Sequence, residues 1–302
     1  MPTSVRYGFR ISAVLAAALS SGICTEAQGP QTPLTITSEQ QVQLRELTSR
    51  ILQHADSAGC KKNSCTILVA NFGGPTGATS TLGMQLADAV SAEFAAQAKG
   101  VQIVDRQKLR QYLEKERIAS KLLEDDNAAR WLAKENGATA VLVGYLRGNQ
   151  QQKVLRVQLL DTRDFAKKNP TPKGPVAEET INDLGYPGDL DPVEPFGAPP
   201  KTELAGETLE SLEGSVPPNC PNHRDPDYTE AARQARFNGG LVLQAVFLKD
   251  GRVTNLRPLK GAPFGLNQSA EQVAREWKCE PATKDGKPVT VSVPVEFTFR
   301  VY

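Results

Sequence analysis

A long stretch rich in proline, glycine and acidic residues constrains this chain more than any other feature. Its runs NPTPKGP, GYPGDLDPVEPFGAPP and GSVPPN lie between residues 162 and 219. Such a composition buries too little apolar surface to form a core, and proline lacks the backbone donor that helices and sheets use. We therefore predict a linker at 162–219, with one short helix near Leu204–Leu212, between a domain at 38–161 and a domain at 220–302.

Residues 1–27 have the pattern of an export signal. Two arginines precede the apolar run ISAVLAAAL, and Thr25 and Ala27 provide the small residues of a signal-peptidase site. The apolar run is shorter than the ~20 residues that span a bilayer. The pattern predicts cleavage after Ala27 and export to the periplasm, so that the chain reaches a membrane only through its partners. The alternative is an uncleaved N-terminus, or one lipid-modified at Cys24, that anchors the chain.

Four cysteines remain once signal cleavage has removed Cys24. In an oxidising compartment they can form the pairs Cys60–Cys65 and Cys220–Cys279. The alternative is a zinc site, because Cys220 and His223 have the spacing of half such a site. No convincing second pair of ligands accompanies them, so we predict two disulfides and no bound metal.

Alternating strand and helix patterns predict an α/β fold for 38–161. Apolar residues recur at helical spacing, and short apolar runs mark buried strands. Asp105, and either Asp125 or Asp126, can cap helices. The predicted elements are helices at Thr37–Ala58, at Thr79–Ala98, after Asp105 and after Asp125 or Asp126, and strands at Thr66–Phe72, Val101–Val104, Ala138–Leu146 and Lys153–Asp161. They form a domain of two or three layers, with Lys153–Asp161 as an edge or antiparallel strand.

The pattern at 220–302 predicts a small α+β domain with a three-stranded antiparallel sheet and two helices. Asp227 and Glu230 form a capping box before the first helix, and Asn267 can cap the second. Asp250-Gly251 predicts a type I′ turn, because both central positions of that turn need positive φ. The predicted strands are Leu241–Leu248, Val253–Leu259 and Val289–Tyr302, the last with alternating apolar and polar residues.

An ordered set of motifs in this region resembles the TonB C-terminal domain family. The motifs are Pro-x-Tyr before the first helix, Gly before the first strand, DGRV in the hairpin, Gly-Leu at the second helix start, Trp at its end, and the turn PATKDGKPV. Two positions depart from the family. Thr229 stands where proline often follows the tyrosine, which weakens the transfer to Tyr228 of the family's Tyr-Pro contact with transporter peptides. Cys279 stands where an aromatic residue is usual, and it suits a local disulfide to Cys220.

The domain at 38–161 is similar to the FlgO/CsgG-type domain of bacterial envelope proteins. The residues that carry this resemblance are ILVANF with its Gly-rich loop, LGMQLADAVSAEF, VQIVDRQKLRQYL and NGATAVLVGYL. Relatives of this type act in envelope assembly and show no catalytic residues. The resemblance therefore implies association with other proteins and identifies no active site.

The motifs that could support catalysis or a cofactor are incomplete. GGPTGATS, at Gly73–Ser80, lies where a phosphate-binding loop would sit, but it lacks the lysine of a P-loop. The alternative is a turn in which Thr79 or Ser80 caps the next helix. The acids Glu124, Asp125 and Asp126 could hold calcium, yet acids before a helix usually complement its dipole. With two histidines, no recognisable catalytic arrangement and a net charge of +1, the sequence predicts no enzyme activity, no cofactor and no nucleic-acid binding.

The last strand is the predicted docking edge. A three-stranded sheet has two open edges, and an extended peptide can add to one of them through main-chain hydrogen bonds. TonB-like domains engage transporters in this way. The alternatives are pairing with a second copy, which gives a homodimer, or a strand that only completes the core. The predicted contact residues are Tyr228, Val291, Ser292, Val293, Val295, Phe297 and Thr298.

These observations predict a non-enzymatic adaptor protein of the bacterial cell envelope, located in the periplasm. Its expected partner is an envelope protein, either an outer-membrane transporter or an assembly factor. The rival interpretation is an energy transducer for TonB-dependent outer-membrane transport. Transduction needs a mechanical connection to the inner membrane, which cleavage after Ala27 would remove unless a partner supplied it.

Overall fold

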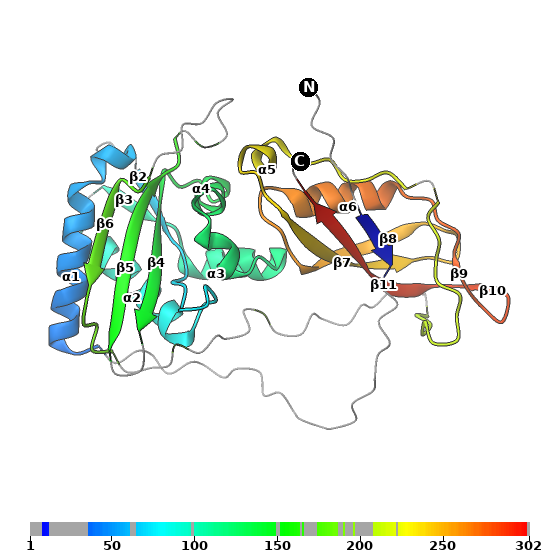
Figure 1. Ribbon diagram of the computed structural model, residues 1–302, viewed down its shortest axis with the longest axis horizontal. Coiled ribbons are helices and arrows are strands. Elements are labelled where there is room, and N and C mark those ends of the chain that lie inside the picture. Colours follow the sequence, from blue (N-terminus) through cyan, green and yellow to red (C-terminus); the bar gives the residue numbers. More distant parts are fainter. Residues whose placement is uncertain are drawn as a thin grey trace. The chain divides into compact units, whose positions relative to one another are not determined.

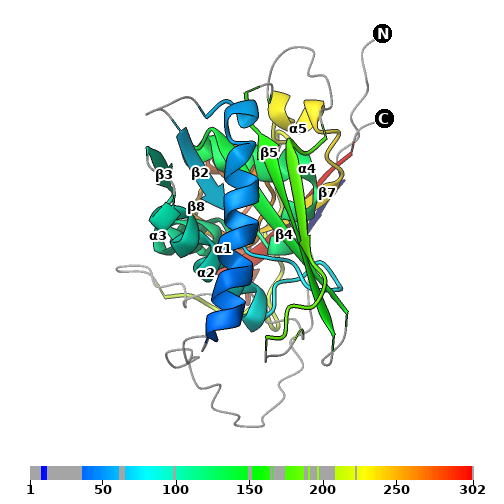
Figure 2. The same ribbon diagram turned by 90° about the vertical axis from the view of Figure 1, so that its left-hand side faces the viewer.

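The computed structural model describes residues 8–11, 36–60, 65–97, 100–148, 152–163, 165, 174–186, 190, 196, 208–221 and 223–300. The chain forms two compact units, each with its own sheet (Figures 1 and 2). The N-terminal unit comprises 28–114 and 119–195, and the C-terminal unit combines 1–27, 115–118 and 196–302. No helix among the described residues is long and apolar enough to cross a membrane.

The N-terminal unit is built on a five-stranded sheet with the order β3-β2-β4-β5-β6. Its strands are β2 (Cys65–Val69), β3 (Val101–Ile103), β4 (Ala140–Gly148), β5 (Lys153–Asp161) and β6 (Ala177–Ile181). β2 is parallel to β3 and β4, whereas β5 is antiparallel to both β4 and β6. The antiparallel interpretation of Lys153–Asp161 is thus confirmed, and this strand lies inside the sheet because β6 covers its other side.

Helices cover both faces of this sheet, so the unit has three layers (Figure 1). The helices are α1 (Ser38–Gln53), α2 (Thr81–Gln97), α3 (Arg106–Glu116) and α4 (Asp126–Glu135), with 3-10 turns η1 (Asp56–Ala58) and η2 (Ser120–Glu124). α1 and α2 supply Leu44, Leu86 and Phe94 to one buried core with β2, β4 and β5. α4 packs against β4 and β5. Asp125, one of the two residues predicted as candidates, caps α4 by accepting from Ala128 N.

β6 lies inside the predicted linker at 162–219, and it corrects that interpretation for the first part of the stretch. It pairs with β5 from Leu155↔Ile181 to Leu159↔Ala177. Leu184 and Tyr186 follow it into the core and are 0% and 2% exposed. The strand sequence AEETI has one exposed and one half-buried glutamate and shortly follows prolines at 170, 172 and 175, so its apolar alternation is too weak to indicate a strand.

The last part of the predicted linker belongs to the C-terminal unit. Glu210 N donates to Thr290 O at 2.9 Å, and residues 216 and 219 form bridges with Thr283 and Glu280. Residues 208–212 are therefore not helical, because their backbone bonds to the sheet region instead. The remainder of the expected helix, 204–207, lies outside the described residues.

The C-terminal unit contains an antiparallel sheet with the order β1-β11-β7-β8. Its strands are β1 (Gly8–Ile11), β7 (Gly239–Phe247), β8 (Val253–Lys260) and β11 (Val291–Phe299), and β9 (Ala282–Lys284) pairs separately with β10 (Lys287–Val289). The helices are α5 (Glu230–Gln234) and α6 (Leu266–Glu276). The predicted three strands and two helices are present, and β1 is an addition that the sequence did not indicate.

Local turn and cap chemistry in this unit differs from the prediction. The β7–β8 turn is not type I′, because Gly251 has φ of 83° whereas Asp250 is not among the residues with positive φ. Gly251 N donates to Leu248 O, and Leu248 N donates to Arg252 O, which makes the loop one residue longer. Thr229, rather than Asp227, caps α5 through Ala232 N.

The cap of α6 is also different. Gly265 precedes the helix in the left-handed conformation, with φ of 74°. Asn267, the predicted cap, is buried in the first turn, where its Oδ1 accepts from Ala262 N at 2.9 Å. Its side chain therefore orders the loop before the helix instead of the helix end.

Candidate functional site

The outer edge of β11 is the candidate binding site. β11 pairs along its whole length with β7, from Val291↔Phe247 to Phe299↔Gly239. On its other side it pairs antiparallel with β1, from Gly8↔Thr298 to Ile11↔Val295. An extended segment of the same chain thus adds to the strand that the sequence predicts as a docking edge. β1 falls within the predicted signal peptide, 1–27, whose other residues lie outside the described part of the chain.

The backbone direction along β11 follows from one hydrogen bond. Thr290 O, just before β11, accepts from Glu210 N, and Glu210 forms a parallel bridge to Val291 on the side away from β7. The N–H and C=O groups of one residue point to the same side of a strand, and the side alternates with each residue. Ser292, Glu296 and Thr298 therefore present their main-chain groups to the outer edge.

Pro294 interrupts this outward row. It lies two residues from both Ser292 and Glu296, so its main-chain groups face the same outer side. Proline, however, has no backbone N–H. Proline in a strand is tolerated where its nitrogen faces away from the ladder, which agrees with β11 being an edge of the β11-β7-β8 sheet. The ladder with β1 ends at Val295, directly beside this gap. A segment that binds here is therefore held mainly between Val295 and Thr298.

Most of the predicted contact residues on β11 can reach a partner only through their main chain. Their side chains lie in the core: Val291, Val293, Val295 and Phe297 are between 0% and 4% exposed. Ser292 and Thr298 are half-buried on the opposite face, and Ser292 Oγ accepts from Gln244 Nε2. Glu296 is exposed on that face and was missed from the sequence. Its place between two core positions in the alternating pattern would have identified it.

Tyr228, the remaining predicted contact residue, is buried in the C-terminal unit. Its hydroxyl donates to Phe237 O, and its ring lies 6.0 Å from that of Phe299. The neighbouring Thr229 donates to Phe264 O at 2.7 Å while it caps α5. Thr229 thus has a structural role at the position where the TonB family often has proline, and a contact between Tyr228 and a partner stays a prediction.

A disulfide and a tryptophan hold the segment before α5 against the end of α6. Cys220 is bonded to Cys279. Trp277 Nε1 donates to Arg224 O at 2.9 Å, and its ring lies 5.7 Å from that of Phe297 in β11. In this arrangement the Cys220 sulfur cannot act as a thiolate ligand. No group of His, Cys, Asp or Glu suited to a metal ion occurs among the described residues.

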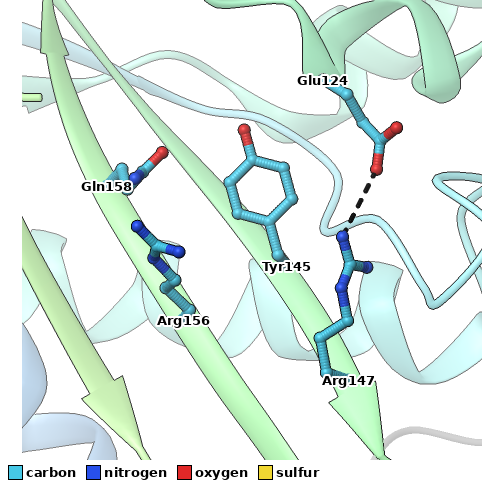
Figure 3. Close-up of a pocket in the computed structure, with 5 residues that line it drawn as sticks. All are labelled: Glu124, Tyr145, Arg147, Arg156 and Gln158. Atoms are coloured by element: carbon cyan, nitrogen blue, oxygen red, sulfur yellow. Dashed lines mark ion pairs between the residues drawn. The ribbon is translucent and has the colours of Figure 1, made fainter. Parts of the chain in front are cut away.

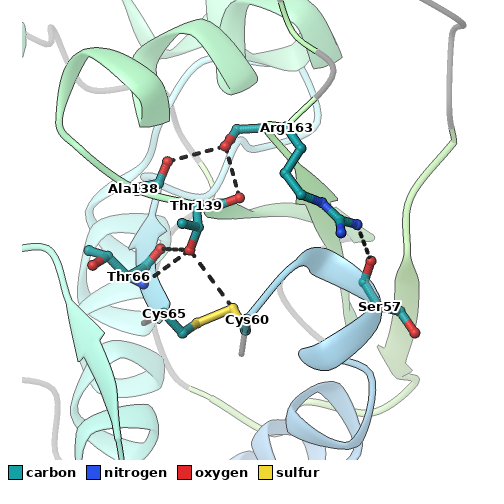
Figure 4. The surroundings of a disulfide bond; sticks show 8 residues. Ser57, Cys60, Cys65, Thr66, Ala138, Thr139 and Arg163 are labelled. Carbon is teal, nitrogen blue, oxygen red and sulfur yellow. Dashed lines mark hydrogen bonds between the residues drawn. A yellow bond between two sulfur atoms is a disulfide. The ribbon is translucent and has the colours of Figure 1, made fainter. Parts of the chain in front are cut away.

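The second disulfide, Cys60–Cys65, ties the segment after α1 to the start of β2 (Figure 4). Thr139 lies beside it: its Oγ1 accepts from Thr66 N, donates to Thr66 O, and is 3.9 Å from Cys60 Sγ. Both cysteines are buried, each 4% exposed. This disulfide therefore belongs to the core of the N-terminal unit, and its environment indicates a structural bond.

The Gly-rich loop after β2 is already filled by groups of the protein. The N–H groups of Gly73, Gly74 and Gly77 donate to backbone carbonyls, so they are not available to a phosphate. The Glu124 carboxylate lies against the loop, since a Cβ at Gly77 would be 2.4 Å from Glu124 Oε2. Ser80 Oγ accepts from Gly83 N at the start of α2. The loop is thus a capped turn, as the alternative interpretation expected, and its geometry does not fit a nucleotide.

Comparisons with known proteins support the C-terminal resemblance. The model of the family described as Gram-negative bacterial TonB protein C-terminal matches residues 224–301. The C-terminal domain structure of TonB from Pseudomonas aeruginosa is 21% identical, with a TM-score of 0.25 and coverage of 29% of this chain and 87% of that chain. A comparison with curated proteins finds no match. The match to the family model confirms the TonB resemblance predicted from the sequence.

Structures of LpoB are also similar to part of this chain. The C-terminal domain of LpoB from Salmonella enterica is 17% identical, with a TM-score of 0.31 and coverage of 46% of this chain and 96% of that chain. LpoB from Escherichia coli is 17% identical, with a TM-score of 0.34 and coverage of 51% of this chain and 77% of that chain. The FlgO/CsgG-type resemblance of the N-terminal domain stays a prediction.

Proposed function

We propose that the module matched by the TonB C-terminal family, residues 224–301, is the partner-binding part of a non-enzymatic adaptor protein of the bacterial cell envelope. The protein is exported to the periplasm, and an extended segment of an envelope protein adds to the outer edge of β11. The observation that carries this proposal is the pairing of β1 with β11, in which residues 8–11 occupy that edge in antiparallel register.

Main-chain and side-chain groups have different roles in this proposal. The outward N–H and C=O groups of Glu296 and Thr298 supply affinity that does not depend on the partner's sequence. Specificity requires a side chain, and Glu296 is the exposed charge in the middle of the paired range. The register places Arg10 of β1 opposite Glu296. A partner segment with a basic residue at this position is therefore favoured, because opposite charges across a strand pair attract.

Site-specific photo-crosslinking tests the location of the partner. A photoreactive residue at Arg300, which is exposed directly after β11, should capture an envelope protein in intact cells and leaves Glu296 in place. The matched control is the same residue at Arg275, an exposed arginine on α6 of the same unit. Equal capture from both positions would contradict docking at β11.

Two substitutions at Thr298 separate main-chain from side-chain contributions. Thr298→Pro removes the outward N–H and should abolish capture from Arg300, whereas Thr298→Val keeps the N–H and the shape of the side chain and should preserve it. Circular dichroism must show that both variants are folded. If the folded proline variant still captures the same protein, strand addition at this edge is wrong.

An energy transducer for TonB-dependent outer-membrane transport is the second candidate, and the family match favours it. It requires a retained N-terminus that connects the chain to the inner membrane. Residues 8–11 would then remain in the chain, but at the cytoplasmic end of the anchoring apolar run, where they could not pair with β11 in the periplasm. The adaptor proposal instead expects their removal, so the mature N-terminus discriminates the two functions.

A further inference from the structure

The N-terminal unit contains a pocket of about 360 Å³ lined by Glu124, Tyr145, Arg147, Arg156 and Gln158. Tyr145 and Arg147 lie near the carboxyl end of β4, and Arg156 and Gln158 lie on β5. Figure 3 shows the Tyr145 ring between Arg156 and Gln158 on one side and the Glu124–Arg147 ion pair on the other. The volume is at the lower end of the range for small-molecule sites, ~300–1,000 Å³.

The topology places this pocket where ligands often bind in α/β sheets. β2 and β4 are parallel, and Gly73, in the loop after β2, bridges to Tyr145. Ligand sites in such sheets lie outside the carboxyl ends of the parallel strands. The lining residues also lie on the face opposite α1 and α2, because their neighbours Leu146, Leu155 and Val157 face that core.

The charges of the pocket balance, which argues against an anionic ligand. Arg147 Nη2 lies 3.9 Å from Glu124 Oε1, and Arg156 Nη2 lies 2.5 Å from Glu178 Oε2 on β6. Arg147 also donates to Gly74 O at 2.8 Å. A phosphate or carboxylate would have to compete with a carboxylate that each guanidinium already holds. The two arginines therefore provide no excess positive charge.

Several hydrogen-bonding atoms in the pocket nevertheless have no partner within the part of the chain that the structure describes. Among the residues that the structure describes, none pairs with Tyr145 Oη, Gln158 Oε1 or the Nε and Nη1 groups of Arg156. The arginine side chains are each 51% exposed, so a ligand can reach them. Burial, with the nearby Asp126 and Glu124 charges, raises the pKa of Tyr145 to about 12, so its phenol keeps its proton at neutral pH. The rim thus offers donors and acceptors side by side.

We infer that this pocket binds a neutral saccharide ring. Each hydroxyl of a sugar both donates and accepts, which matches the mixture of the Arg156 N–H groups, the Tyr145 hydroxyl and the Gln158 carbonyl. The Arg147 guanidinium lies over the Tyr145 ring, 5.9 Å from its centroid, and the remaining surface of the ring gives the ligand an apolar contact between these groups. The site lies on β4 and β5 of the N-terminal unit and does not involve β11.

Titration of the ¹⁵N-labelled protein with cellotriose and tri-N-acetylchitotriose tests this inference by NMR. The two trisaccharides share their linkage and differ in the acetamido groups. We expect saturable shifts of backbone amides in Tyr145–Arg147 and Arg156–Gln158 with one of them or both. Inorganic phosphate should leave these amides unchanged. The absence of saturable shifts with either trisaccharide at millimolar concentration would overturn the inference, and so would equal shifts with phosphate, which would indicate an anion site.

A pair of arginine variants provides the control. Arg156→Gln should weaken saccharide binding roughly tenfold or more, since it removes charge-assisted donors. Arg50→Gln should leave it unchanged, because Arg50 likewise pairs with a β6 glutamate, Glu179, but does not line this pocket. Equal affinities of the two variants would overturn the inference. Amide shifts elsewhere in the spectrum report whether each variant remains folded.

Discussion

Gly251 connects the β7–β8 turn to the disulfide-bonded end of α6. Its φ of 83° is left-handed, and its carbonyl accepts from Cys279 N at 2.9 Å. A Cβ at this position would lie 2.1 Å from Cys279 O, closer than any real contact. Gly251 in the motif Asp-Gly-Arg-Val is therefore required for two reasons: the positive φ of the turn and the close approach of Cys279. The sequence reveals only the first.

We expect Gly251→Ala to destabilise the protein more than Gly286→Ala. Both positions have positive φ, which costs a non-glycine residue ~1–2 kcal/mol. A Cβ added at Gly286 would meet no other atom within 4 Å, whereas alanine at 251 must also displace the Cys279 backbone. Urea unfolding of both variants measures the difference. Equal urea midpoints for the two variants would show that the turn can move away from Cys279 without loss of stability.

The raised pKa of Tyr145 predicts that the protein loses stability in alkali. Burial raises the pKa of Tyr145 from 10.0 to about 12 in the folded protein. Below pH 10 the Tyr145 phenol makes its full contribution to the free energy of unfolding, because the folded and unfolded states both hold its proton. Between pH 10 and 12 the unfolded chain loses that proton first, so the free energy of unfolding falls with rising pH. The fall should be smaller in Tyr145→Phe, and subtracting the two profiles removes the effects of the other titrating groups. Parallel profiles would contradict this pKa.

At the level of elements, strong apolar patterns were predictable and weak ones were not. The Lys153–Asp161 strand has the predicted bounds, because every second residue enters the core. β6 was missed because prolines at 170, 172 and 175 shortly precede it and because its partner, β5, determines its register. The caps of α5 and α6 were misassigned because several side chains near each start could serve. The choice between Thr229 and Asp227 depends on Phe264, which is distant in sequence.

The two disulfides should differ in their contributions to stability. Their cysteines are separated by 59 residues in Cys220–Cys279 and by 5 in Cys60–Cys65. In the chain-entropy model, removing the disulfide that closes the long loop lowers the free energy of unfolding by ~4 kcal/mol, and removing the one that closes the short loop lowers it by ~2 kcal/mol. Replacing each pair with alanines and measuring denaturant unfolding tests this order. Peptide mapping without reduction should first recover both linked pairs, and free thiols at all four positions in the exported protein would refute them.

At the scale of the whole molecule, composition predicted two units but not their limits. The proline-rich stretch separates them, yet the first unit continues through β6 to 195, and Glu210 belongs to the second. The alternating pattern of Val291–Phe299 identified the candidate edge. The segment that occupies it could not be predicted, because pairing of β1 with β11 brings together the two ends of the chain and leaves no local signal.

The mass of the mature protein tests the proposed export. The small residues at Thr25 and Ala27 predict a periplasmic chain that starts at Gln28. Cell fractionation followed by intact mass measurement determines the N-terminus. Recovery of the uncleaved chain in the inner membrane would favour the anchored transducer.

Pro294 also limits how readily the open edge of β11 can promote aggregation. An exposed edge strand is a template on which further strands can stack, and long uninterrupted edges promote fibril growth. On β11, the missing N–H of Pro294 limits the uninterrupted pairing range to a few residues, so a chain without β1 would have a short adhesive patch in place of a continuous template. The same proline that shortens the binding register would therefore keep this protein in solution when its edge is empty.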